Sequence, residues 1–141
     1  MNSLISDSGI VVGAGRTERA VALDLVRDFM DALGRRDFAV AKALLGPDFR
    51  MTVSGNHVFR TLEAFSEFSR GRNGAVRKHS ATLEATESAT GVAVYISGTM
   101  SGAWLDGSTF TDVRFIDRFL LVDGRIVDMQ VWSDMAEFRP R

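Results

Sequence analysis

Apolar residues in the first half of the chain recur every three or four positions, the spacing of one face of a helix. Three segments show this pattern, and they predict helices over residues 18–33, over residues 38–45 and from residue 62 onward. Each segment follows a residue whose side chain can cap the first helical turn, namely Thr17, Asp37 and Thr61. Gly34 and the Gly46-Pro47 pair end the first two helices.

The period of the apolar residues changes to two in the second half, which is typical of β-strands. Phe49, Met51 and Val53 form one early strand, and a loop at residues 55–57 follows it. Four longer strands are expected after Gly74, and the last covers residues 125–133. A polar turn at residues 87–91 separates the first two, and Asp-Gly pairs at residues 106–107 and 123–124 are hairpin signals for the others.

Helices that precede a run of strands indicate the α+β class. The expected architecture is a curved antiparallel sheet packed against three N-terminal helices. Gly98 and Gly102 lie inside the second long strand, and they suggest the bulges or bends that let a sheet curl into a cone. Residues 1–16 are rich in Gly and Ser and are expected to form a flexible arm, and residues 17–141 are expected to form a single domain.

Composition narrows the function classes. The 141 residues are 45% hydrophobic and carry a formal net charge of −1, with both signs interspersed, so nothing attracts nucleic acid or an anionic membrane. No apolar run reaches the roughly 18 residues that a membrane span needs, and the N-terminus lacks the basic cluster of a secretion signal, so a cytoplasmic location is expected. The chain has no cysteine and two histidines, which makes a metal site improbable, and no cofactor is expected.

One acidic residue stands out in the third long strand. Alternation places Asp117 in a row with four apolar residues, whereas Asp112, Arg114 and Arg118 lie on the other face. The four apolar members of the row are Val113, Phe115, Phe119 and Leu121. Burying an ionised carboxylate is costly, so Asp117 is expected to be paired, hydrogen-bonded or kept neutral by a raised pKa. These are also the conditions under which a carboxyl group becomes a useful acid or base.

Three stretches of sequence resemble the nuclear transport factor 2-like superfamily, with ketosteroid isomerases and SnoaL-like polyketide cyclases as the nearest matches. They are Phe-Ile-Asp-Arg-Phe at 115–119, Asp-Gly-Arg-Ile at 123–126 and Met-Gln-Val-Trp-Ser-Asp at 129–134. The resemblance covers residues 17–138 and implies a cystatin-like α+β barrel with a conical pocket that Asp117 faces. It also implies a homodimer through the outer face of the sheet.

Several positions differ from the catalytic residues of these related enzymes, and the differences disfavour two of the reactions known in the superfamily. The tyrosine of ketosteroid isomerases corresponds to Phe29, and their base aspartate falls near Val53, so classical ketosteroid isomerisation is disfavoured. Limonene epoxide hydrolases need an Arg-x-Asp pair where this chain has residues 97–100, and a further aspartate where it has Val131. A hydrolase of that type is therefore disfavoured as well.

His79 is the second candidate for catalysis. Alternation puts it on the inward row with Ala81, Leu83 and Ala85, and puts Lys78 on the outward row. Scytalone dehydratases place a histidine on the equivalent strand, so the resemblance allows an acid/base role. A histidine that hydrogen-bonds a backbone carbonyl at the strand's edge is the structural alternative.

The residues expected to line a ligand pocket are Phe29, Met51, Val53, Phe65, Val94, Phe115, Phe119, Met129, Val131 and Trp132, for which core packing is the blander explanation.

The predicted function is cofactor-independent acid/base chemistry on a small hydrophobic, carbonyl-bearing molecule. Isomerisation, intramolecular aldol cyclisation and dehydration all remain open, with Asp117 either moving a proton or donating a hydrogen bond to an enolate. Two alternatives stay beside it. One is a noncatalytic binding or assembly module with the same fold, and the other is a hydrolase in which His79 and Asp117 activate a water molecule.

Overall fold

The computed structural model describes residues 17–141, and the arm expected over residues 1–16 lies outside the described residues. Helix α1 (Glu18–Gly34) is followed by α2 (Phe38–Ala43), strand β1 (Leu45–Val53), strand β2 (His57–Phe59) and α3 (Leu62–Arg70). Four long strands follow, β3 (Asn73–Glu87), β4 (Val92–Trp104), β5 (Thr109–Val122) and β6 (Arg125–Ser133), and a short 3-10 helix, η1 (Met135–Phe138), comes after them. The α+β class and the three helices are confirmed.

The caps predicted from the sequence start each helix. Side-chain oxygens of Thr17, Asp37 and Thr61 accept hydrogen bonds from the backbone N–H groups three residues later.

We expect Thr17→Ala to lower the free energy of unfolding by about 1 kcal/mol, and Thr17→Ser to lower it much less because serine keeps the capping oxygen. Urea unfolding followed by circular dichroism measures both. Equal losses in the two variants would show that the cap hydrogen bond is not the cause.

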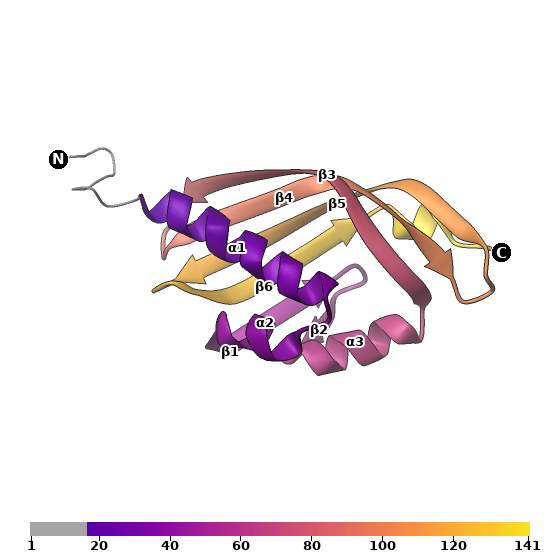
Figure 1. Cartoon of the computed structure of the whole chain (residues 1–141), viewed down its shortest axis with the longest axis horizontal. Helices are drawn as coiled ribbons and strands as arrows, with labels where there is room; N and C mark the ends of the chain where they lie inside the picture. The colour runs from indigo at the N-terminus through magenta and orange to yellow at the C-terminus, as the bar shows by residue number, and fades with distance from the viewer. Residues whose placement is uncertain (1–16) are drawn as a thin grey trace.

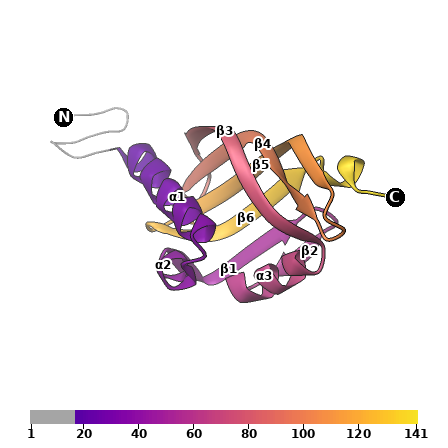
Figure 2. The same cartoon turned by 45° about the vertical axis from the view of Figure 1, so that its right-hand side comes forward.

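The six strands form one sheet in the order β2-β1-β6-β5-β4-β3, and the sheet is strongly curved (Figures 1 and 2). All neighbouring strands are antiparallel except β1 and β6, which run parallel. Three features differ from the sequence prediction. The second helix, expected over residues 38–45, ends at Ala43, and β1 begins at Leu45, before the expected strand at Phe49. Strand β2 begins at His57, the last residue of the loop expected at residues 55–57, and pairs with β1, and the sheet is mixed rather than wholly antiparallel.

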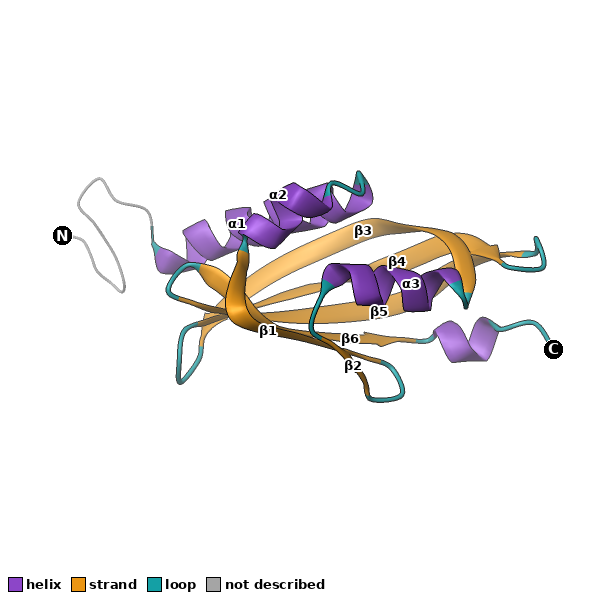
Figure 3. Ribbon diagram, turned by 90° about the horizontal axis from the view of Figure 1, so that it is seen from below, coloured by secondary structure: helices purple, strands orange, loops and turns teal. Residues whose placement is uncertain are grey.

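Helix α1 packs against β3 and β4, α3 packs against β2 and β3, and α2 lies against both of these helices (Figure 3). The core between them includes Phe29 of α1 and Phe119 of β5, both fully buried, whose rings meet edge to face with centroids 5.8 Å apart. None of the helices among the described residues is both long enough and apolar enough to cross a membrane.

Irregular pairing beside the two glycines of β4 bends the sheet. Between His79 and Thr82, β3 contains one residue more than the facing segment of β4, and Gly98 lies opposite that bulge. Beside Gly102, β5 contains the extra residue, and Asp112 there has a φ of 57°. A Cβ atom on Gly102 would lie 2.4 Å from the carbonyl oxygen of Ala75, so only glycine allows this close approach.

Candidate functional site

Asp117 lies on the inner face of β5 and is wholly buried, with an exposed fraction of 0%. The alternation predicted for this strand is confirmed, because Val113, Phe115, Phe119 and Leu121 are buried with it. Its direct neighbours across the sheet are Ile96 on β4 and Val131 on β6, so the carboxyl group stands in an apolar row. A carboxylate in such a row loses its water and needs a partner from elsewhere.

Lys78 of β3 is that partner. Its Nζ lies 2.6 Å from Oδ2 of Asp117 and 4.6 Å from the centre of the Phe115 ring. The pairing register explains how it reaches inward: Lys78 is opposite Met100, which is opposite the fully buried Val113. The Lys78 side chain keeps 28% of its surface exposed, whereas the Asp117 side chain keeps none. The ammonium group therefore covers the carboxylate.

Two opposing effects act on the proton affinity of Asp117. Burial raises the pKa of its carboxyl group above the ordinary value of 3.8, and the charge and hydrogen bond of Lys78 lower the pKa, but the net direction is upward. The other carboxyl oxygen, Oδ1, is buried and has no hydrogen-bond partner in the described part of the chain. An ionised carboxylate would leave that acceptor unsatisfied, which also favours a proton on Asp117.

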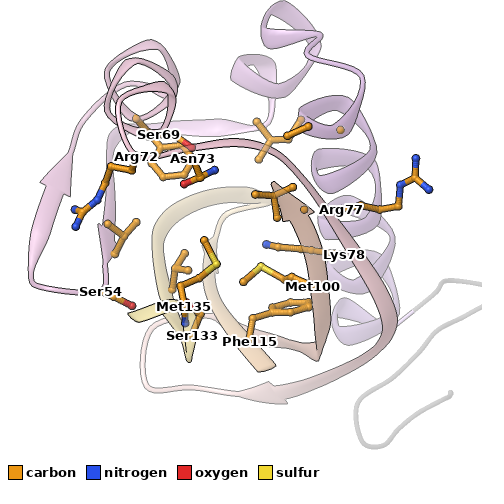
Figure 4. Close-up of a pocket in the computed structure, with 18 of the residues that line it drawn as sticks. Ser54, Ser69, Arg72, Asn73, Arg77, Lys78, Met100, Phe115, Ser133 and Met135 are labelled. Carbon is orange, nitrogen blue, oxygen red and sulfur yellow. The ribbon is translucent and has the colours of Figure 1, made fainter. Parts of the chain in front are cut away.

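A cavity of about 1360 Å³ opens above this pair, between α1, α3, the inner face of the sheet and η1. Its walls are mainly apolar, and Lys78 points into it beside Phe115 and Met100 (Figure 4). Asp117 is not among the lining residues. A ligand in the cavity would therefore meet the amine of Lys78 first, with the carboxyl group directly behind it.

The model of the SnoaL-like domain matches residues 26–129, which is most of the chain. This chain belongs to the SnoaL-like domain family. No curated protein matches its sequence.

Solved structures of SnoaL-like and related domains share the fold. A nuclear transport factor 2-like protein of unknown function from Burkholderia pseudomallei is 23% identical, with a TM-score of 0.71, over 84% of this chain and 94% of that one. TerC, co-crystallised with polyporic acid, is 17% identical, with a TM-score of 0.70, over 84% and 95%. A protein from Xanthomonas campestris, provisionally described as a polyketide cyclase, is 18% identical, with a TM-score of 0.66, over 86% and 96%. At these identities the likeness concerns the fold alone.

The ten residues expected to line a pocket separate into three groups in this SnoaL-like domain. Those that line the cavity are Met51, Val53, Phe65, Phe115, Met129 and Val131. Phe29, Val94 and Phe119 are instead fully buried in the core and do not reach the cavity. Trp132 was wrongly expected at the pocket: it is paired with Ile116 on the outer face of the sheet and is 47% exposed.

His79 does not lie on the inward row, so that expectation is wrong. It is paired with Thr99, which is paired with the exposed Arg114, and this row belongs to the outer face. Its Nε2 lies 2.7 Å from Oγ of Ser101. The bulge that follows His79 is the physical cause, because one extra residue reverses which side chains face inward. His79 and Asp117 consequently lie on opposite faces, which removes support from a hydrolase that uses both to activate water.

Sequence reasoning missed Lys78 for the same reason. Strict alternation from Leu83 back along the strand places Lys78 outside, and only the bulge brings it inside. A signal was nevertheless present: Val76 and Leu83 are both apolar but are separated by an odd number of positions. Both line the cavity, which requires an extra residue between them.

Within residues 17–141 no cluster of three or more potential metal-ligating side chains occurs.

Proposed function

We propose that this SnoaL-like domain is a cofactor-independent enzyme that moves a proton at a carbon next to a carbonyl group. The substrate would be a small hydrophobic molecule bound in the cavity. The observation that carries this proposal is the 2.6 Å contact between Lys78 and the buried Asp117 beneath an apolar cavity. A buried acid paired with an amine at the surface of an apolar cavity is the kind of group that general acid/base catalysis uses.

The pair can hold its shared proton on either partner. When the proton is on Asp117, the amine of Lys78 is neutral, lies at the cavity surface and can accept a proton from the substrate carbon. The substrate then becomes an enolate, and the new ammonium group beside it stabilises the negative oxygen. Returning the proton from Lys78 to another carbon gives isomerisation. Attack of the enolate on a second carbonyl, with the proton passing from Lys78 to the new alkoxide, gives aldol cyclisation. Departure of a β-hydroxyl group, which takes the proton from Lys78 and leaves as water, gives dehydration.

Asp117 in this scheme stores and returns a proton without touching the substrate. Its raised pKa makes protonation easier near neutral pH than for an ordinary aspartate. The co-crystallisation of TerC with polyporic acid adds support, because a domain of the same fold was crystallised with an organic acid. The noncatalytic binding or assembly module remains the alternative, since the same cavity could hold a ligand without chemistry.

Deuterium exchange tests the proposal without knowledge of the final product. All three reactions begin by removing a proton from carbon, so the protein in D2O should incorporate deuterium into suitable ligands. The probes are a panel of aromatic ketones and 1,3-diketones, analysed by mass spectrometry. We expect exchange above the buffer rate for at least one compound that also binds. Binding without any accelerated exchange would support the noncatalytic module instead.

The homodimer through the outer face of the sheet stays a prediction. Ile116 and Trp132 are direct cross-strand neighbours there, with exposed fractions of 37% and 47%. An exposed apolar pair of this size is often covered by a partner. We expect sedimentation equilibrium to show a dimer, and Trp132→Glu to shift it towards monomer. A monomeric wild-type protein at micromolar concentration would contradict the prediction.

A further inference from the structure

The charges around the cavity are unequal, although the whole chain has a net charge of −1. Among the described residues that line the cavity there are four arginines and Lys78, but only one acidic residue, Asp31. Two of the arginines contribute little to the field inside. Arg27 is paired with Asp24, and Arg77 is directed away from the cavity (Figure 4). The remaining cations are Lys78, Arg72 and Arg139.

Arg72 lies in an exposed position at the outer edge of the cavity wall, just before β3, and its guanidinium group extends towards the rim, away from Lys78 (Figure 4). Its guanidinium carbon is 4.8 Å from the centre of the Phe68 ring, and no carboxylate of the described residues pairs with it. The Phe68 ring is itself packed against Phe59 and His57, with centroids 5.0 Å and 4.7 Å away. The ring therefore provides a fixed support for the guanidinium group.

Whether an arginine is held by a carboxylate or by an aromatic ring decides whether it can still bind an anionic ligand. A carboxylate partner neutralises an arginine and occupies its N–H donors, as it does for Arg114, whose Nε lies 2.7 Å from Asp134. An aromatic ring attracts the cation by its quadrupole but leaves the full charge and the in-plane donors available. Arg139 is placed similarly, 5.9 Å from the centre of the Trp104 ring. The rim thus offers positive charge that no carboxylate of residues 17–141 neutralises.

We propose that the ligand of this cavity is an amphipathic organic anion, whose apolar body fills the cavity and whose negative group is held at the rim by Arg72. The inference rests on the proposed function only in taking the same cavity as the ligand site. It narrows the substrate class to hydrophobic carbonyl compounds that carry a carboxylate or a similar anionic group. Lys78 stays available at the inner end for the carbonyl oxygen.

Two dyes with the same skeleton test this proposal. 1-Anilinonaphthalene-8-sulfonate is anionic, and N-phenyl-1-naphthylamine lacks the sulfonate, so their affinities differ through the charge. By fluorescence titration we expect the wild-type protein to bind the anionic dye more tightly and to lose this preference in high salt. We expect Arg72→Gln to weaken the anionic dye about tenfold, the scale of a lost charge-assisted hydrogen bond, and to leave the neutral dye unchanged.

Three further variants make the result decisive. Arg72→Lys keeps a positive charge and should keep most of the preference, and Arg77→Gln removes a neighbouring arginine that points away and should change neither dye. Equal affinities of the two dyes in the wild-type protein would overturn the proposal. The proposal would also be overturned if the preference for the anionic dye survived in Arg72→Gln but disappeared in Lys78→Met. A third contrary result would be weaker binding of both dyes in Arg72→Gln and equally in Arg72→Lys. Deuterium exchange is measured separately, so the catalytic proposal can fail while the anion preference stands.

Discussion

Replacing Asp117 by asparagine should lower the rate of deuterium exchange by about 10²- to 10⁴-fold, the range that a positioned acid or base contributes. Asparagine has nearly the same shape, but it cannot store the proton that Lys78 must give up to act as a base. The hydrogen bond from Lys78 to the retained oxygen keeps the side chains in place. Mass spectrometry of the exchanged ligand gives the rate, and ligand affinity should change much less than the rate.

A matched control separates loss of chemistry from loss of structure. Asp128 on β6 is also a poorly exposed carboxylate, but it pairs with Arg50 and Arg118 and does not line the cavity. Asp128→Asn should therefore leave the exchange rate within a few-fold of wild type. An Asp117→Asn protein that is folded, binds ligand and exchanges deuterium at the wild-type rate would exclude Asp117 from the reaction.

Replacing Lys78 by methionine should cost stability in a pH-dependent way. Methionine removes the amine that pairs with the fully buried Asp117 in the described part of the chain, and breaking a buried pair in this way typically costs about 3–5 kcal/mol. Lys78 lowers the pKa of Asp117, so its loss raises that pKa further. The folded protein then binds the Asp117 proton more tightly than the unfolded chain, and stability falls as pH rises from the ordinary value of 3.8 through the folded pKa.

Urea unfolding at pH 5 and pH 8 measures this effect. We expect Lys78→Met to lose about 3 kcal/mol relative to wild type at pH 8 and clearly less at pH 5, where Asp117 is more easily protonated. Adding Asp117→Asn to Lys78→Met should remove most of the pH dependence, because the titrating group is gone. The chain has one other lysine, Lys42, which pairs with Glu63 on the surface and provides the control. A loss of equal size at both pH values would mean that packing, rather than charge, is responsible.

Local signals account for what the sequence predicted well. The caps at Thr17, Asp37 and Thr61 and the helical periodicity depend on neighbours within four residues, and all three helices appear where expected. The buried row that contains Asp117 was predicted because β5 alternates regularly through that segment. Gly98 and Gly102 indicated that the sheet is curved, and family resemblance supplied the cavity, which alternation alone could not specify.

What the sequence missed depends on contacts between distant segments. Strand β2 has three residues and exists only through its pairing with β1, and the parallel pairing of β1 with β6 joins residues more than 70 positions apart in the sequence, such as Arg50 and Asp128. The bulge after His79 had the largest consequence, because it turned His79 outward and brought Lys78 in. Gly98 indicated an irregularity at this point, but a single sequence does not show which of two paired strands carries the extra residue.

Carbon-13 NMR titration of the Asp117 carboxyl group tests most directly whether a buried acid is coupled to Lys78 beneath the cavity. The resonance can be assigned by its absence in Asp117→Asn. We expect Asp117 to titrate above the ordinary aspartate value of 3.8, and to titrate higher still in Lys78→Met. A midpoint at or below 3.8 in the wild-type protein, or one that does not move when Lys78 is replaced, would contradict the coupled pair and the chemistry built on it.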